Sequence, residues 1–207
     1  MTADATSATV LARRQSPLRH LADQLAATGS DETVMLEELP FRTVVELRVA
    51  PGGDGPERLA GALGVPLPEK AGEVTGGGSR HVLWLGPEWW LLTDEPETTA
   101  TLESPTATEL RQTAGPTASV VDVSAQVTTL RLAGPWARTV LEHGCSLDLH
   151  PRAFGAGSCA QTVLAKAPVI LHQTTEDEYR ILVRASFADY LARWLLDAMT
   201  EYVQAEA

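Results

Sequence analysis

Short segments in which apolar and polar side chains alternate recur along the whole chain, separated by turns rich in glycine and proline. Alternation with a period of two predicts a strand that buries one face, so a set of such segments favours a fold built on sheets. The predicted strands span residues 33–39, 43–49, 81–85, 89–93, 119–123, 127–132, 159–165, 169–173 and 179–183.

Five further segments carry helix signals, such as a serine or proline at the start and a glycine at the end. They span residues 17–28, 56–63, 105–113, 134–143 and 186–202. The order along the chain predicts an α+β fold with largely antiparallel sheets, made of two halves that each resemble a split βαβ unit of ferredoxin type.

The expected halves cover about 16–124 and 125–207 and together form a single domain, 16–207. Residues 1–15 are rich in alanine, threonine and serine and lack the apolar stretch of a signal peptide, so we expect a disordered leader there. Residues 66–80, which contain Gly76-Gly77-Gly78, are expected to form a flexible connector.

The net charge of -11 argues against two classes of partner, because a negative surface repels phosphate backbones and anionic lipid headgroups. No apolar run approaches the roughly 20 residues of a membrane span. We therefore expect no nucleic acid and no membrane as partners. The chain has only two cysteines, Cys145 and Cys159; a bridge between them is possible, but free thiols in a reducing, cytoplasmic setting are favoured.

Motifs that would give the chain a reaction of its own are largely missing. The glycine clusters do not have the G-x-G-x-x-G spacing of a dinucleotide site. The spacing of His143, Cys145, His150 and Cys159 does not match a zinc signature, and buried thiols with surface histidines explain these residues more simply.

Two catalytic interpretations stay open beside the structural ones. Cys145 could be a thiolate nucleophile if His143 or His150 acted as its base, although a small apolar residue behind a helix is favoured. Asp122 and Asp148 could form a carboxylate pair, although Asp122-Val123-Ser124 more plausibly ends a strand and caps the next turn. The sequence thus predicts no catalytic, cofactor-binding or metal-binding residue.

Tryptophans gather around one predicted hairpin, at Trp84, Trp89 and Trp90. Neighbouring residues of a strand point to opposite faces, so Trp89 and Trp90 cannot both fill one core. Both could pack inside the protein, or one could contact a partner, since tryptophan is enriched at the centre of protein interfaces.

Five segments stand out as a set: Ser16-Pro17-Leu18, the run from Leu83 to Leu92, Val121 to Ser124, Leu132 to Pro135, and above all Leu141 to Phe154. Together they resemble the gamma subunit family of heterotetrameric sarcosine oxidase, and the last is similar to the family's "GC-x-LDLHP-x-xF" run. The likeness spans roughly residues 16 to 203.

This resemblance implies a fold like the folate-binding region of the glycine-cleavage aminomethyltransferase. It implies a structural, non-catalytic subunit that works with alpha, beta and delta subunits, which are expected to hold FAD, FMN, NAD and tetrahydrofolate. The complex would demethylate sarcosine oxidatively to glycine, with hydrogen peroxide and formaldehyde or methylenetetrahydrofolate as the other products.

The expected contact residues lie on the tryptophan hairpin and on the loop from Leu147 to Phe154. They are Trp84, Trp89, Trp90, Asp148, His150, Arg152 and Phe154. Two alternatives remain beside this hypothesis. One is a free-standing folate-dependent aminomethyltransferase-like protein; the other is a module that binds a small molecule for regulation.

Overall fold

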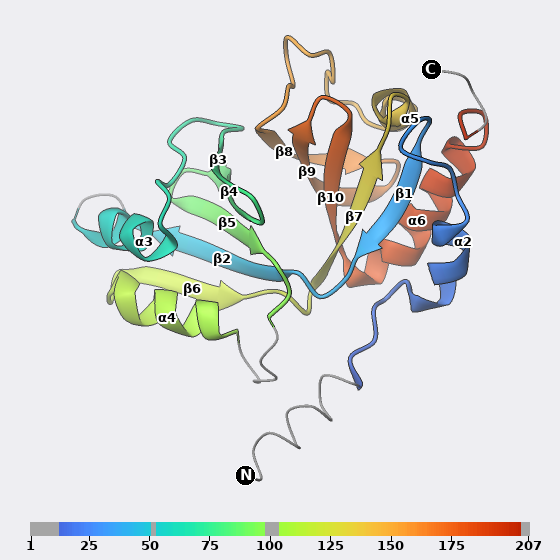
Figure 1. Ribbon diagram of the computed structural model, residues 1–207. Coiled ribbons are helices and arrows are strands. Elements are labelled where there is room, and N and C mark those ends of the chain that lie inside the picture. The colour runs from blue at the N-terminus through green and yellow to red at the C-terminus, as the bar shows by residue number, and fades with distance from the viewer. Residues whose placement is uncertain (1–12, 51–52, 98–103, 204–207) are drawn as a thin grey trace. The chain divides into compact units, whose positions relative to one another are not determined.

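The computed structural model describes residues 13–50, 53–97 and 104–203, and it divides into two compact units. Each unit contains one antiparallel five-stranded sheet with helices packed against it (Figure 1). Phe41–Ala125 form most of the first unit, and Pro17–Pro40 together with the chain from Gln126 form the second. The predicted α+β class is confirmed. The expected leader, 1–15, lies outside the described residues except for 13–15.

The first unit alternates strands with two helices. Its elements are β2 (Thr43–Val49), α3 (Gly55–Leu63), β3 (Val74–Gly77), β4 (Arg80–Gly86), β5 (Trp89–Asp94), α4 (Pro105–Ala114) and β6 (Ala118–Asp122). The strand order across the sheet is β3-β4-β5-β2-β6. Without β3, this is the ferredoxin-type order, in which the two split βαβ connections interleave.

Local sequence explains where α4 begins and where α3 ends. Ser104 caps α4, because its hydroxyl oxygen accepts a hydrogen bond from the Ala107 N–H at 3.1 Å. Gly64 ends α3 in the left-handed conformation, with a φ of 73°. Both helices then bury one apolar face against the sheet. The core of the first unit contains Val45, Leu47, Val49, Leu59, Leu63, Val82, Trp90, Leu92, Ala107, Leu110, Ala114 and Val120.

The second unit begins with the N-terminal segment and continues after the first unit. Its elements are the 3₁₀ helix η1 (Arg19–Leu21), α2 (Ala22–Ala26), β1 (Met35–Leu39), β7 (Val127–Ala133), α5 (Ala137–Glu142), β8 (Ser158–Leu164), β9 (Ala167–Thr175), β10 (Glu178–Arg184) and α6 (Ala185–Ala198). The strand order is β1-β7-β10-β9-β8.

The two units share one topology with one difference in connectivity. β7, α5, β8, β9, β10 and α6 repeat the order of β2, α3, β3, β4, β5 and α4, and their sheet positions match. The first unit then adds β6 after its second helix. The second unit fills the same edge position with β1 from the start of the chain, as the blue strand beside β7 in Figure 1 shows.

A close backbone approach fixes the N-terminal segment against β7. Gly134, which follows β7, has a φ of +111°, and a side chain there would bring a Cβ within 2.4 Å of the Thr33 carbonyl oxygen. The same oxygen accepts a hydrogen bond from the Trp136 N–H at 3.3 Å. Only glycine fits such a contact, so residue 134 lets the chain enter β1 beside β7.

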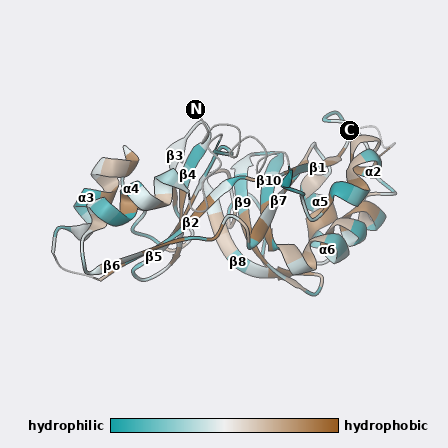
Figure 2. Ribbon diagram, turned by 90° about the horizontal axis from the view of Figure 1, so that it is seen from below, coloured by the Kyte–Doolittle hydropathy of each residue, from teal (hydrophilic) through white to brown (hydrophobic). Residues whose placement is uncertain are grey.

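The core of the second unit is closed mainly by α6. In Figure 2 this helix carries both hydrophobic and hydrophilic residues, as an amphipathic helix on a sheet should. Its buried residues are Ala188, Leu191, Ala192 and Leu195. They share one hydrophobic core with Leu36 on β1, Leu132 on β7 and Ile181 on β10, each of which is 0% exposed.

Two features differ from the sequence-based expectations. The compact units do not follow the expected halves of about 16–124 and 125–207, because residues 17–40 pack with the later part of the chain. Part of the expected flexible connector, 66–80, forms strand β3. Gly76 allows this, since with a φ of +114° its backbone lies so close to β4 that a Cβ would fall 2.3 Å from the Arg80 carbonyl oxygen.

Candidate functional site

The tryptophan hairpin places its three indole rings on two faces of the sheet. Trp84 and Trp90 are cross-strand partners on β4 and β5, and both face the helices. Trp90 is only 9% exposed, and its indole N–H donates a hydrogen bond to the Pro68 carbonyl oxygen at 2.8 Å. Trp84 is partly buried against the same core. Trp90 is therefore chiefly a core residue, and Trp84 lies at the edge of the core.

Trp89 lies on the opposite face, which the helices of the first unit do not cover. The Arg48 guanidinium stands 4.4 Å from its ring centroid, in a cation–π contact, and the Arg48 Nε–H donates to Glu46 Oε1 at 2.7 Å. The indole nitrogen of Trp89 is buried and finds no hydrogen-bond partner among the described residues. Trp89 is thus the hairpin tryptophan with an unused polar group.

An open groove of about 540 Å³ lies on the helix side of the hairpin. Helix α3, the segment from Pro66 to Glu69, and the β4–β5 hairpin form its walls. Indole rings, prolines and carboxylates are all among the lining residues. The lining includes Trp84, Trp90, Leu67, Glu57, Glu69 and Glu88.

The loop from Leu147 to Phe154 in the second unit has a buried and an exposed part. Phe154 is 4% exposed and packs in the core of this unit, so its side chain is part of the core and not of the surface. The sequence pattern could not separate these cases, because a loop gives no periodicity that marks the buried face. Leu149 is buried with it, at 2% exposed.

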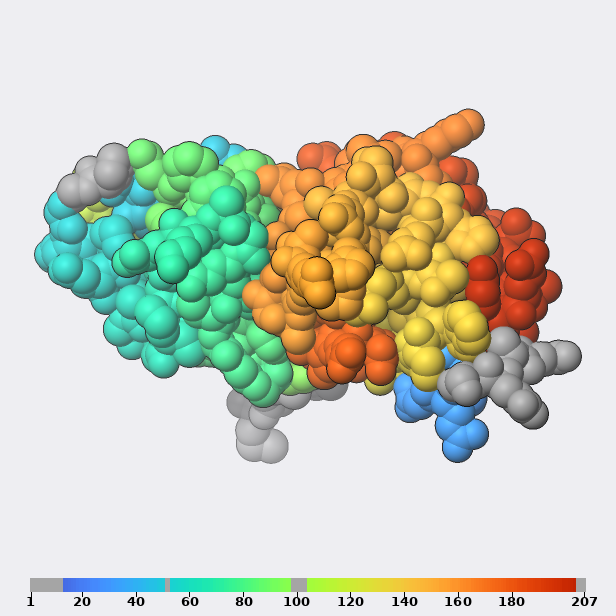
Figure 3. Space-filling model, turned by 90° about the horizontal axis from the view of Figure 1, so that it is seen from above, coloured from blue at the N-terminus to red at the C-terminus, as the bar shows by residue number. Residues whose placement is uncertain are grey.

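The segment falls in the yellow to orange part of the colour scale in Figure 3. Its polar residues Asp148, His150 and Arg152 are exposed. Asp148 Oδ1 accepts the His150 N–H at 2.9 Å, and His150 Nδ1 accepts the Arg152 N–H at 3.2 Å. Two further backbone bonds, from the N–H groups of Ala153 and Phe154, end on the His150 carbonyl oxygen. The loop therefore holds a defined shape and presents three charged or polar side chains to solvent.

The side chains considered for catalysis have local structural partners. Asp122 accepts hydrogen bonds from the Ser104 N–H and from both the N–H and hydroxyl of Ser124, so it ties a strand end to a helix start. The ring of His143 bonds the Tyr202 hydroxyl at 2.8 Å, which docks the C-terminal turn on α5. The Cys145 sulfur lies 3.9 Å from the Thr162 hydroxyl. Asp122 belongs to the first compact unit and Asp148 to the second.

Cys145 and Cys159 are both free thiols. Across residues 13–50, 53–97 and 104–203, no group of three or more His, Cys, Asp or Glu side chains is arranged to hold a metal ion. Over the same ranges, none of the helices is both long and apolar enough to cross a bilayer.

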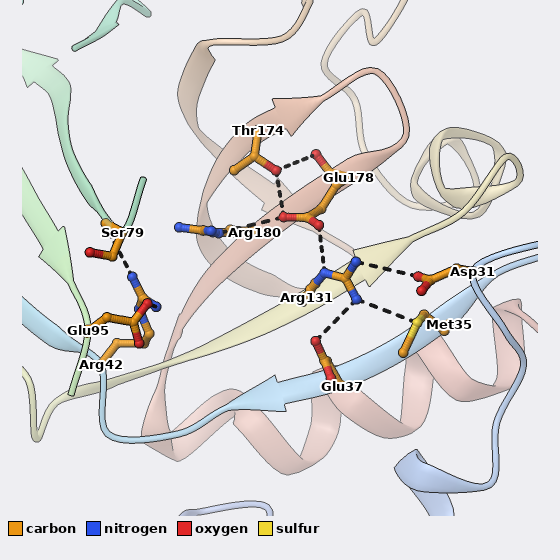
Figure 4. A network of polar contacts seen from close by, with 10 residues as sticks. All are labelled: Asp31, Met35, Glu37, Arg42, Ser79, Glu95, Arg131, Thr174, Glu178 and Arg180. Atoms are coloured by element: carbon orange, nitrogen blue, oxygen red, sulfur yellow. Dashed lines mark hydrogen bonds and ion pairs between the residues drawn. The ribbon is translucent and has the colours of Figure 1, made fainter. Parts of the chain in front are cut away.

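A charged network that the sequence did not reveal lies on the helix-free face of the second sheet (Figure 4). The Arg131 guanidinium on β7 donates to Glu178 Oε2 at 2.7 Å and to Glu37 Oε1 at 3.2 Å, and it lies 3.5 Å from Asp31. The contacts join three neighbouring strands, β1, β7 and β10. Only strand pairing brings these residues together, so no spacing in the sequence could signal them.

The network also sets the protonation of Glu178. Partial burial alone would raise its pKa, but hydrogen bonds from Arg131 and Thr174 outweigh this and hold the pKa below its ordinary value of 4.5. Glu178 is therefore ionised at neutral pH. Burial alone would lower the pKa of Arg131, but its contacts with the carboxylates of Glu178, Glu37 and Asp31 outweigh this and raise the pKa. This arrangement stabilises the pairing of β1, β7 and β10.

Comparison with known structures first defines the class of protein. The fold matches that of the glycine cleavage system aminomethyltransferase T from Bartonella henselae with a TM-score of 0.64 at 16% identity, covering 88% of this chain and 57% of that chain. At this identity the likeness shows the fold alone. The chain thus has an aminomethyltransferase-like fold.

The family follows from closer matches. The model of the sarcosine oxidase gamma subunit family matches residues 57–201. The sarcosine oxidase subunit gamma of Corynebacterium sp. (strain U-96) is 43% identical over 198 residues, which is 93% of both chains, and that of an Arthrobacter species is 42% identical over 91% of both. The chain belongs to the sarcosine oxidase gamma subunit family.

A solved structure agrees with this assignment. The chain is similar to one in the structure of heterotetrameric sarcosine oxidase from Corynebacterium sp. U-96 in complex with pyrrole 2-carboxylate, with a TM-score of 0.84 and 42% identity. The match covers 94% of this chain and 98% of that chain. The resemblance noted in the sequence is therefore confirmed at the level of family and fold.

Proposed function

We propose that this chain is the gamma subunit of a heterotetrameric sarcosine oxidase and that it acts with alpha, beta and delta subunits. The observation that carries the proposal is the match over 94% of the chain to a protein of that complex. The complex would act in the cytoplasm and convert sarcosine to glycine by oxidative demethylation.

The contribution of the chain is structural. The groups with catalytic potential, Asp122, His143 and Cys145, are engaged in capping, docking and packing contacts. FAD, FMN, NAD and tetrahydrofolate would be held by partner subunits, because cofactor binding and subunit support can be divided among chains.

The surfaces offered to partners are the hairpin and the 147–154 loop. Trp84 and Trp89 supply large, rigid contact area on opposite faces of the first sheet, while Asp148, His150 and Arg152 are presented by an ordered loop. Rigid side chains lose little conformational freedom when a partner binds, so such surfaces favour affinity.

Co-expression tests the proposal. The chain is produced with and without the alpha, beta and delta subunits encoded in the same cell, and each preparation is assayed for sarcosine-dependent oxygen consumption. We expect activity and flavin absorbance only in the four-chain complex. Turnover by the isolated chain, or its failure to co-purify with the other three, would contradict the proposal.

A folate-binding assay separates the alternative activity. Tetrahydrofolate is titrated into the isolated chain and into the complex by calorimetry. We expect heat of binding only with the complex. Saturable binding to the isolated chain would favour a free-standing aminomethyltransferase-like protein instead.

A further inference from the structure

The groove beside the tryptophan hairpin has a preformed shape. Four prolines line it, Pro56, Pro66, Pro68 and Pro87, and each fixes its own backbone φ. The Trp90 indole is held in place by its hydrogen bond to Pro68. Binding in such a groove costs little ordering of the protein, which is a property of surfaces that bind partners.

The backbone at Glu69 and Lys70, at the end of the groove wall, is also held in place. The Glu73 carboxylate accepts hydrogen bonds from the Glu69 and Lys70 N–H groups at 3.0 and 3.1 Å. These bonds hold the backbone that carries Glu69 along the groove wall.

The charged residues that line the groove are all acidic. Glu57, Glu69 and Glu88 line it, and no lysine or arginine does. Within the described parts of the chain, none of these three carboxylates forms an ion pair with a basic side chain. The groove therefore combines apolar indole and proline surfaces with uncompensated negative charge. A group that fits it should be cationic and flanked by apolar atoms, since cations bind favourably over indole faces and beside carboxylates.

We propose that this groove receives a segment of another subunit of the complex, and that the segment carries a lysine or arginine flanked by apolar side chains. This inference rests on the proposed function, because it names a contact of the gamma subunit. The groove is open to solvent and about 540 Å³ in volume, which suits several side chains of a peptide. A second copy of this chain fits poorly, because a symmetric contact would bring the same carboxylates together.

The turn of the hairpin provides a variant that separates folding from binding. Glu88 has a φ of +61°, in the left-handed region that glutamate adopts reluctantly and asparagine tolerates well. Glu88→Asn should therefore keep or raise the melting temperature of the chain. If the Glu88 carboxylate contacts the partner subunit, the same substitution should weaken binding of the chain to the other subunits.

The first experiment measures re-association of the purified chain with the alpha–beta–delta complex. The test variant combines Glu57→Gln, Glu69→Gln and Glu88→Asn. A matched control neutralises three exposed glutamates elsewhere and consists of Glu32→Gln, Glu109→Gln and Glu201→Gln. We expect the dissociation constant of the test variant to rise at least about tenfold and that of the control to stay near wild type. For Trp84→Ala we expect a rise of about 30-fold.

Salt dependence gives a second readout of the same contact. Wild-type association should weaken as sodium chloride is raised, and the test variant should lose part of that dependence. Equal affinities for wild type and test variant, or equal losses in test and control variants, would overturn the inference.

Photocrosslinking identifies the occupant directly. A benzoylphenylalanine replaces Ala60, which lines the groove, or Gln112, an exposed control position on α4. We expect position 60, and not 112, to crosslink to a peptide of another subunit that contains a basic residue beside apolar ones. Adducts only with a second copy of the chain, or no adducts in an assembled complex, would overturn the inference while the proposed function stands. A wild-type chain that does not assemble at all would overturn both.

Discussion

The placement of the N-terminal strand can be tested with two matched leucine substitutions. Leu36 on β1 and Leu47 on β2 are each 0% exposed, and each lies in the core of a different unit. They are separated by few residues along the chain. The structure therefore predicts that Leu36→Ala destabilises the second unit and that Leu47→Ala destabilises the first.

The magnitude follows from the burial. Truncating a fully buried leucine removes three carbon atoms from the core and leaves a cavity, at a cost of about 3 kcal/mol. A loss of this size lowers the equilibrium protection of backbone amides by about 100-fold, since each 1.4 kcal/mol is a factor of ten. Leu36 packs on the same face as its cross-strand partner Leu132 on β7, whereas Leu47 pairs with Trp90 and Val120.

Hydrogen exchange followed by mass spectrometry separates the two units. For Leu36→Ala we expect faster exchange in peptides of β7 and β10 and little change in β4 and β5; for Leu47→Ala we expect the reverse. If Leu36→Ala loosened β4 and β5 and spared β7 and β10, the assignment of the N-terminal strand to the second unit would be refuted. Equal loosening of both units by both variants would show that they open as one and would also contradict the reasoning.

Three further outcomes are expected. Glu178→Gln should lower the free energy of unfolding at neutral pH by about 1–2 kcal/mol, between the values for exposed and buried ion pairs. Because the pKa of Glu178 is lowered in the fold, its contribution is present above its ordinary value of 4.5 and is lost as pH falls through the folded pKa, so urea titrations of variant and wild type should converge in acid. Phe154→Ala should cost about 3 kcal/mol or more in the same assay, while Arg152→Ala, on the exposed side of the loop, should change it by less than about 0.5 kcal/mol. Under native conditions a thiol reagent should modify the partly buried Cys145 first and reach Cys159, 2% exposed, only after unfolding.

A specific experimental result would contradict each of these three predictions. A stability difference for the glutamine variant that persists in acid would mean that charge at position 178 does not stabilise the fold. A mild effect of Phe154→Ala would show that the loop aromatic is not packed as described. Equal reaction rates for the two thiols in the native chain would contradict their different burial.

The sequence was sufficient to predict the types of most elements. The hairpin from residue 81 to 93 was identified because alternation and a Gly86-Pro87 turn are local signals, and the structure has β4 and β5 there. It also showed that Trp89 and Trp90 lie on opposite faces, since that follows from the strand period. Which of the two fills the core was not predictable, because it depends on where α3 and α4 pack.

Other features required the folded chain. Residues 74–77 looked like linker because glycine is disfavoured in strands, yet tight pairing with β4 makes glycine necessary at position 76. Phe154 was a predicted subunit-contact residue, but its side chain lies in the core, and only the packed loop shows which side is covered. The network around Arg131 joins residues far apart in the chain and becomes visible only with the strand register.

By itself, the sequence determined the α+β class, the repeated order of strands and helices, and the family. Only the tertiary structure decided that β1 completes the sheet of the second unit and that the first unit closes with β6 instead. The physical reason is that hydrophobic periodicity records which residues of a segment are buried, and does so locally. It does not record against which partner they are buried. Burying Leu36 and its neighbours beside β7 lowers the free energy of the folded chain by more than the modest entropy cost of closing a long loop. Gly134 also permits the close backbone approach that this pairing requires.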